Sequence, residues 1–258
     1  MTTARVRLVD STGTVVGSGE PGPRRRLAAA AEQRPDTERL DRIHTELVVA
    51  ALARRGLQQF IDVRLPMLRG FEDDLHRIAR RIQPRATWLC IDHELPSSRA
   101  RRTLGTMLGG AHVVRARFEE MDQLLDAAEA RLDRTQPIAV LLHDVLFQVR
   151  DAPARAGMVL LREWLAAGSA VSLTHPSPDL IGRARPADLT ARRAPLFQGR
   201  RRAQIAALLD GFHQVGRMVP THQWHPSHPY RGQPGWAAGG YAALAFTPHP
   251  SSREGACM

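Results

Sequence analysis

A histidine and an aspartate follow one of the most apolar segments of the chain. His143 and Asp144 come directly after residues 137–142, whose apolar side chains predict a buried strand. An imidazole can take a proton from a hydroxyl or an amine at neutral pH, because its ordinary pKa is about 6.5. One interpretation is therefore a general base with a carboxylate beside it. The other, which the residues alone favour, is a polar pair that only forms hydrogen bonds at the end of a strand.

Two further acids stand at the ends of apolar segments. Asp62 lies near the end of residues 57–63, and Asp92 follows residues 86–91. A carboxylate at such a position accepts hydrogen bonds from a ligand, or it caps the following turn. Both interpretations remain open from the residues alone.

Apolar segments of strand length alternate with segments of helical period along most of the chain. A helix is expected from near Asp36 to the stop at Gly56. The further helices are expected at 70–82, 97–108, 121–132, 155–166 and 203–209, and the strands at 57–63, 86–91, 111–114, 137–142, 170–174, 215–219 and 241–246. This alternation predicts an α/β domain with a mostly parallel central sheet and helices on both faces. Ligands of such sheets bind beyond the carboxyl ends of the strands, which is where the polar residues above must lie.

The order of these segments resembles the actinobacterial S-adenosyl methyltransferase family, long catalogued as a domain of unknown function. The matching stretches are Gln59-Phe60-Ile61-Asp62-Val63, Leu65-Pro66, Ile91-Asp92-His93-Glu94, Pro137 to Asp151, Thr174-His175, Leu209-Asp210-Gly211-Phe212 and Trp224-His225-Pro226. The resemblance covers about residues 57–246. It implies a Rossmann-like class I methyltransferase fold, S-adenosylmethionine as the cofactor and methyl transfer as the activity.

The resemblance also implies which residues bind the cofactor. Asp62 and Asp92 are the retained acids, and His93 adjoins the second, whose carboxylate is expected to accept both ribose hydroxyls. The family carries a Gly-Thr-Gly turn after the first strand, where this chain has the single residue Arg64. Its side chain is expected to occupy space left for the methionine and ribose parts of the cofactor. Arg117 stands where the family has an acid near the adenine.

Three functions are compatible with this pattern. The first is a methyltransferase that acts on a small molecule or a peptide, in specialised metabolism, through an altered cofactor loop. The second is a catalytically inactive domain that keeps the fold and binds a protein partner. The third is an enzyme of another reaction type that uses the emptied pocket, because a fold alone does not determine a function.

Charge and composition limit the chemistry and the binding partners that are expected. The chain has 258 residues and a formal charge of +10, and all of its 36 basic residues are arginines. Schiff-base chemistry on lysine is thereby excluded. The charge is spread along the chain and few aromatics accompany it, so nucleic acid is not the expected partner. Residues 183–202 carry seven arginines, and the run Arg200–Arg202 precedes a helix, where positive charge is unfavourable against the helix dipole. Another partner of these arginines, such as phosphate or an acidic protein, would explain this conflict.

The remaining features concern boundaries and location. We expect a basic N-terminal arm at 1–35, the α/β domain at 36–247 and a C-terminal tail at 248–258. No apolar run is long enough to span a membrane, no signal peptide is recognisable, and the two cysteines suggest a reducing cytoplasm. His222, His225 and His228 are spaced by three, but nearby prolines argue against a helix that would present them to a metal. We therefore expect structural or surface histidines and no metal site.

Overall fold

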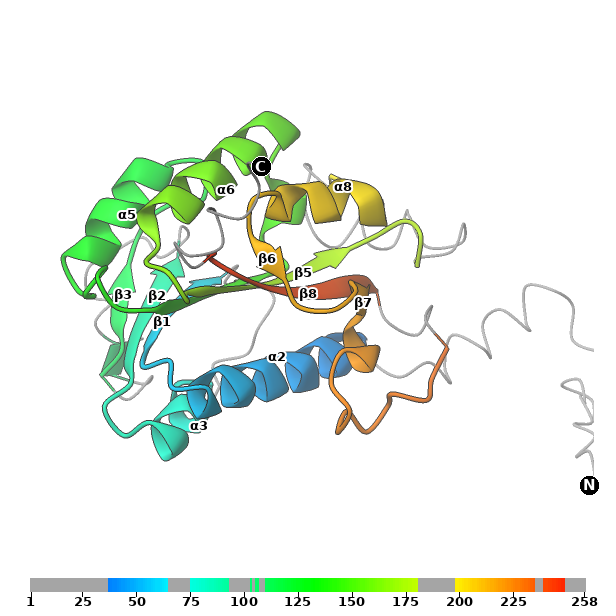
Figure 1. Cartoon of the computed structure of the whole chain (residues 1–258), viewed down its shortest axis with the longest axis horizontal. Coiled ribbons are helices and arrows are strands. Elements are labelled where there is room, and N and C mark those ends of the chain that lie inside the picture. Colours follow the sequence, from blue (N-terminus) through cyan, green and yellow to red (C-terminus); the bar gives the residue numbers. More distant parts are fainter. Residues whose placement is uncertain are drawn as a thin grey trace, which may run out of the picture. The chain divides into compact units, whose positions relative to one another are not determined.

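The computed structural model describes residues 37–64, 75–92, 103, 105–106, 110–180, 198–234 and 239–248. These residues belong to one compact unit that begins at Thr37. Within the described residues, an eight-stranded sheet forms the middle layer and helices lie on both of its faces (Figure 1). The predicted fold class is confirmed.

The sheet reverses its strand order in the middle. Its strands are β1 (Gln59–Arg64), β2 (Thr87–Asp92), β3 (His112–Val114), β4 (Ile138–His143), β5 (Ala170–Pro176), β6 (His213–Gln214), β7 (Val219–Pro220) and β8 (Gly240–Phe246). They lie in the order β3-β2-β1-β4-β5-β8-β6, and β7 also pairs with β8. β1 to β5 are parallel, whereas β8 runs antiparallel to β5. The order therefore reverses between β1 and β4, which is where open α/β sheets bind ligands.

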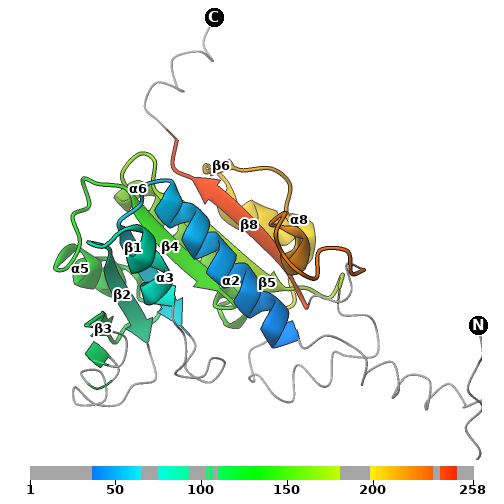
Figure 2. The ribbon, with the colours of Figure 1, turned by 90° about the horizontal axis from the view of Figure 1, so that it is seen from below.

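Two sets of helices cover the sheet. The helices are α2 (Thr37–Arg54), α3 (Leu75–Ile82), α5 (Met121–Glu129), α6 (Asp151–Trp164) and α8 (Arg202–Ala206), with the short helices η2 (Leu146–Gln148), η3 (Ala207–Leu209) and η4 (Thr221–Gln223). α2 and α3 lie on one face, called here the α2 face, and α5, α6 and α8 lie on the other (Figure 1). α2 lies across β4 and β5 (Figure 2).

Strand pleating explains why both faces hold a core. Successive side chains of a strand point to opposite faces. In β1, Phe60 packs in the core on the α2 face and Ile61 in the opposite core. The same alternation assigns Leu141 of β4 to the α2 face and Val140 to the other. Burial of each such large side chain stabilises the fold by about 1.5–3 kcal/mol.

Most predicted elements are present with shifted ends. The strand expected at 215–219 is wrong, because the chain instead forms β6 and β7 around Gly216, whose φ of 67° cannot continue a strand. The helix expected at 155–166 begins earlier, at Asp151, after the extended residue Arg150. The predicted helix at 97–108 lies almost entirely outside the described residues, as do the start of the 70–82 helix and the predicted terminal segments.

One glycine permits the close pairing of β5 and β8 at the carboxyl edge, the edge where the parallel strands end. Gly240 pairs with Pro176, and a Cβ atom at Gly240 would lie 2.7 Å from the carbonyl oxygen of His175.

We predict that Gly240→Ala lowers the free energy of unfolding by about 1–3 kcal/mol, because the backbone of β5 must move to admit the methyl group. Urea denaturation measures the change. Gly232→Ala is the matched control, since nothing lies within 4 Å of its Cβ position. Equal stability of the two variants would contradict the close approach.

Candidate functional site

Two buried acids lie near the carboxyl ends of the neighbouring strands β1 and β2. Asp62 is 2% exposed and Asp92 is 3% exposed. In the sheet, Asp62 pairs with Cys90 and Arg64 pairs with Asp92, so the two acids lie on neighbouring strands two residues apart. Strand alternation directs both toward the α2 face, as it does Phe60 and Cys90. The sequence predicted these two acids as a pair, and the structure brings them together.

The residue that replaces the expected glycine turn continues the strand. Arg64 is the last residue of β1, and its backbone pairs with Asp92. Its side chain and His93 lie outside the described part of the chain, so their predicted contacts with the cofactor remain predictions. Arg117 is exposed in the turn before α5, where its backbone carbonyl accepts a hydrogen bond from Glu120. Its cofactor role also remains a prediction.

His143 is enclosed between α2 and β5. The ring is 3% exposed, and its Nδ1 lies 3.1 Å from Oγ1 of Thr45 while its Nε2 lies 2.8 Å from Oγ of Ser172. The Thr45 hydroxyl donates its proton to the carbonyl of Asp41, 2.9 Å away, so it accepts from His143. These contacts place a proton on Nδ1, and Nε2 bonds the Ser172 hydroxyl. Because both nitrogens are occupied, the geometry favours a positioning role for His143 over a general base.

Asp144 stands in a strained turn at the end of β4. Its φ of 54° lies in the left-handed region, which a residue other than glycine rarely adopts. Thr174 of β5 holds the turn: its Oγ1 accepts the backbone N–H of Asp144 at 3.0 Å and donates to Oδ1 at 3.2 Å. Unlike His143, Asp144 is half-buried. Of the two predicted catalytic residues, it is the more exposed.

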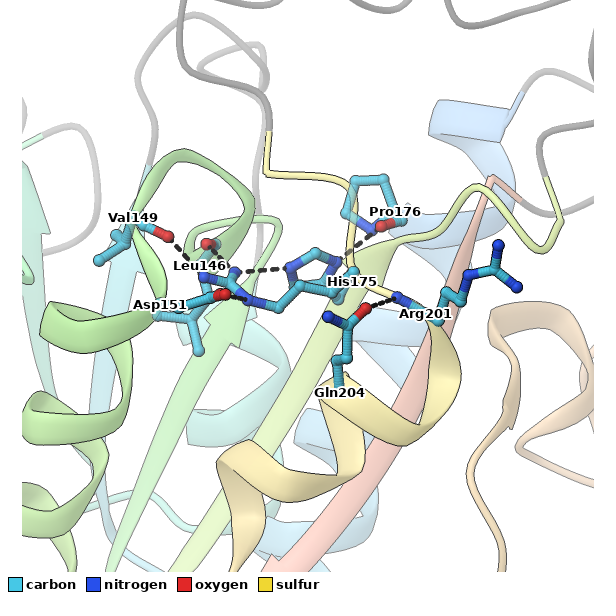
Figure 3. A network of polar contacts seen from close by, with 8 residues as sticks. Leu146, Val149, Asp151, His175, Pro176, Arg201 and Gln204 are labelled. Carbon is cyan, nitrogen blue, oxygen red and sulfur yellow. Dashed lines mark hydrogen bonds and ion pairs between the residues drawn. The ribbon is translucent and has the colours of Figure 1, made fainter.

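A buried arginine joins the loop after β4 to the end of β5. Arg200 is 2% exposed, and its Nε donates to Oδ1 of Asp151 at 2.7 Å. One terminal nitrogen donates to the carbonyl of Leu146 and the other to that of Val149, both at 2.6 Å. Figure 3 shows these groups converging beside His175. The sequence left an external partner of the arginines in residues 183–202 open, and for Arg200 the partners belong to the chain itself.

His175 completes this network as a neutral ring. Its Nδ1 donates to the carbonyl of Pro176 at 2.6 Å, so its Nε2 accepts from Arg200 at 3.1 Å (Figure 3). The pKa of His175 is lowered to about 4: burial is the main cause and the Arg200 charge adds to it, whereas the hydrogen bond to Pro176 and the Asp151 charge oppose it. Gln204 caps the start of α8 beside this network. Its side chain accepts the backbone N–H of Arg201, the residue before the helix, at 2.9 Å (Figure 3).

Comparison with known proteins identifies the family. Residues 24–248 match the model of the family described as S-adenosyl methyltransferase. The chain belongs to this family. A DUF574 family protein from Streptomyces avermitilis is similar at 24% identity, with a TM-score of 0.70 over 81% of this chain and 83% of that one. A putative methyltransferase from Thermobifida fusca gives 19% identity and a TM-score of 0.66, over 90% and 91% of the two chains.

More distant structures share the fold. Human N-acetylserotonin methyltransferase, solved with S-adenosylmethionine, is 12% identical with a TM-score of 0.50, over 80% of this chain and 52% of that one. No functionally curated protein matches the sequence. The predicted family and its cofactor, S-adenosylmethionine, are confirmed.

The residues at the carboxyl edge fit this cofactor. S-adenosylmethionine offers ribose hydroxyls and an ammonium group, all of which are hydrogen-bond donors. Asp62 and Asp92 supply buried carboxylate acceptors on adjacent strands at the point where the strand order reverses.

Among the described residues, no helix is long and apolar enough to cross a membrane. Within the same part of the chain, no three His, Cys, Asp or Glu side chains lie close enough to hold a metal ion.

We predict that His175 makes the protein less stable in acid. The unfolded chain takes up a proton near the ordinary pKa of 6.5, whereas the folded ring takes it up only near 4. The contribution of His175 to the free energy of unfolding is therefore fully present above pH 6.5. It is lost as the pH falls toward 4, and the loss amounts to about 3 kcal/mol.

Urea denaturation at several pH values tests this prediction. His175→Asn, which keeps a donor near the Pro176 carbonyl, is expected to lower stability at neutral pH but to flatten its pH dependence by one proton. His213→Asn, at an exposed position, is the control and should keep the wild-type slope. An unchanged slope in His175→Asn would show that the ring does not titrate as described.

Proposed function

We propose that this chain binds S-adenosylmethionine across the carboxyl ends of β1 and β2 and methylates a small molecule or a peptide held beyond β4. The observation that carries the proposal is the pair of buried acids, Asp62 and Asp92, at the reversal of the strand order. Family membership supports the same cofactor.

The cofactor supplies an activated methyl group on its sulfonium. The protein must then place the acceptor atom in line with that methyl, which accounts for much of the catalysis in such a transfer. Asp92 would accept hydrogen bonds from the ribose hydroxyls, and Asp62 would accept from donors on the methionine side. The half-buried carboxylate of Asp144 would take the proton of the acceptor hydroxyl or amine as the methyl group leaves the sulfur and the carbon–sulfur bond is replaced by a carbon–oxygen or carbon–nitrogen bond.

His143 positions Asp144 through hydrogen bonds to neighbouring elements. Its ring bonds Thr45 on α2 and Ser172 on β5, and it directly precedes Asp144. It therefore fixes the strand end from which Asp144 projects.

A second function is favoured by one specific observation. Arg64 continues β1 where the family has its glycine turn, and glycine is the residue that lets a backbone approach the cofactor closely. A chain that cannot bind the cofactor in this way would be an inactive member of the family that binds a protein partner.

Cofactor titration separates the two functions. We predict that isothermal titration calorimetry detects binding of S-adenosylmethionine and of its demethylated product to the wild-type protein. Asp92→Asn should weaken binding by about ten- to a hundredfold, because charged hydrogen bonds to the ribose hydroxyls are lost. Asp126→Asn, at an exposed position on α5, is the matched control and should bind as the wild type does.

The outcomes differ clearly. If the wild type shows no heat of binding and no thermal shift at millimolar cofactor, methyl transfer is excluded and the inactive domain is supported. If Asp92→Asn folds and binds as tightly as the wild type, Asp92 is not the ribose acceptor.

We also predict that Arg64→Ala tightens cofactor binding by about three- to tenfold. The reason is that ordering or displacing a long side chain costs about 0.5–1.5 kcal/mol, which the shorter residue avoids. Titration of this variant is compared with that of Arg131→Ala, an exposed arginine in the turn after α5. Weaker binding in Arg64→Ala alone would show instead that the guanidinium contacts the cofactor.

A further inference from the structure

Two histidines of a loop-rich segment are buried against α2. The segment, residues 221–233, begins with η4 and lies beside α2 below β7 (Figure 1). His222 is fully buried and His228 is 3% exposed, although most of their neighbours in the segment are half-buried or exposed. The sequence favoured structural or surface histidines here, and for these two the structural interpretation is confirmed.

The hydrogen bonds of His228 require a neutral ring. Its Nδ1 accepts the backbone N–H of Tyr230 at 3.2 Å. Its Nε2 therefore carries the proton and donates to the carbonyl of Leu40 in α2, at 3.2 Å. A second proton on Nδ1 would face the Tyr230 N–H, so two donors would oppose each other and the contact would break.

The contacts of His222 also favour a neutral ring. Its Nε2 donates to the carbonyl of Gln233 at 3.0 Å, which closes the segment on itself. Its Nδ1 is buried and has no hydrogen-bond partner within the described residues. Protonation would bury an N–H without an acceptor, which costs about 1–3 kcal/mol. The rings of His222 and His228 also stand edge to face, with centroids 6.3 Å apart.

The segment and the candidate site share the first half of α2. His228 bonds Leu40, and the neighbouring carbonyl of Asp41 accepts the Thr45 hydroxyl that bonds His143. A row of rings makes the same connection: the His44 ring lies 5.7 Å from that of His143 and 5.2 Å from that of Trp224. Movement of this part of α2 would therefore remove the Thr45 bond from the end of β4.

We propose that His222 and His228 are positioning residues whose neutral rings hold residues 221–233 against α2, and that their protonation in mild acid releases this segment together with the first turns of α2. Neither histidine is part of the proposed cofactor site at Asp62 and Asp92. The docking stands without any assumption about activity. Its effect on methyl transfer, through Thr45 and His143, rests on the proposed function.

The surroundings of the two rings favour the neutral form. The titratable and charged groups that the described contacts place around them are His225, Tyr230 and Arg231 of the segment, together with Arg39 of α2 over the Tyr230 ring and His44 of α2 against Trp224. Burial lowers the pKa of His228, the bond to Leu40 raises it in part, and the neighbouring His222 and His225 lower it further. Burial also lowers the pKa of His222, partly offset by the bond to Gln233. The docked state therefore binds fewer protons than the released state, so docking weakens as the pH falls below 6.5.

Hydrogen–deuterium exchange on the full chain without cofactor tests this proposal. Amide protection factors are compared between about pH 7.5 and about pH 5, after correction for the intrinsic exchange rate at each pH. We expect residues 221–233 and the first turns of α2 to lose protection together, by up to about tenfold per pH unit for each histidine that takes up a proton. Peptides from α5 should keep their protection and serve as the internal reference.

Variants test whether the two histidines cause the pH dependence of protection. His222→Gln combined with His228→Gln replaces both rings by side chains that keep a donor but do not titrate, so the pH dependence of protection should disappear. His213→Gln, at an exposed histidine, should retain it. The proposal is overturned if the wild type shows no pH dependence, if the double variant keeps it, or if the segment opens while α2 stays protected. None of these measurements uses the cofactor, so their failure is distinct from failure of the proposed function.

Discussion

Polar groups buried at the carboxyl ends of β4 and β5 must find hydrogen-bond partners inside the protein, and much of the architecture around the candidate site follows from this requirement. An unpartnered buried polar group costs about 1–3 kcal/mol, a large share of the stability of a domain. His143 is satisfied by Thr45 and Ser172, and Asp144 by Thr174. The two strands are thereby fixed to each other and to α2 at the place where a substrate would sit.

The need to pair buried polar groups also explains why the two halves of α2 differ in polarity. Its second half is apolar, with Val49 and Leu52 packed on the cores of β1 and β2. Its first half lies over the polar ends of the strands, so it carries His44 and Thr45 instead. In the same half, His228 donates to the Leu40 carbonyl. One helix is therefore bonded both to the 221–233 segment, through Leu40, and to the end of β4, through Thr45.

The sequence predicted the sheet well because its signals are local. Apolar strands such as Ile138–His143 and amphipathic helices such as Met121–Glu129 are visible as periodic patterns, and the resemblance set their order. Strand ends also pointed to Asp62, Asp92 and His143. The partners of these groups were missed, because Thr45 lies 98 residues from His143 and Ser172 lies 29 away. A signal for Ser172 existed: a polar residue in an otherwise apolar strand that is buried on both faces must be hydrogen-bonded.

Arg200 shows why a local pattern can also mislead. A run of arginines before a helix conflicts with the helix dipole, and this conflict suggested a ligand. The first arginine of the run instead folds back, and its charge is matched by Asp151 and by two carbonyl oxygens of the loop after β4. A buried guanidinium with several donors suits this task, since its planar fork can bond the carboxylate, two carbonyls and the neutral ring of His175 at once. The charge that suggested an external anion thus joins the loop after β4 to the end of β5.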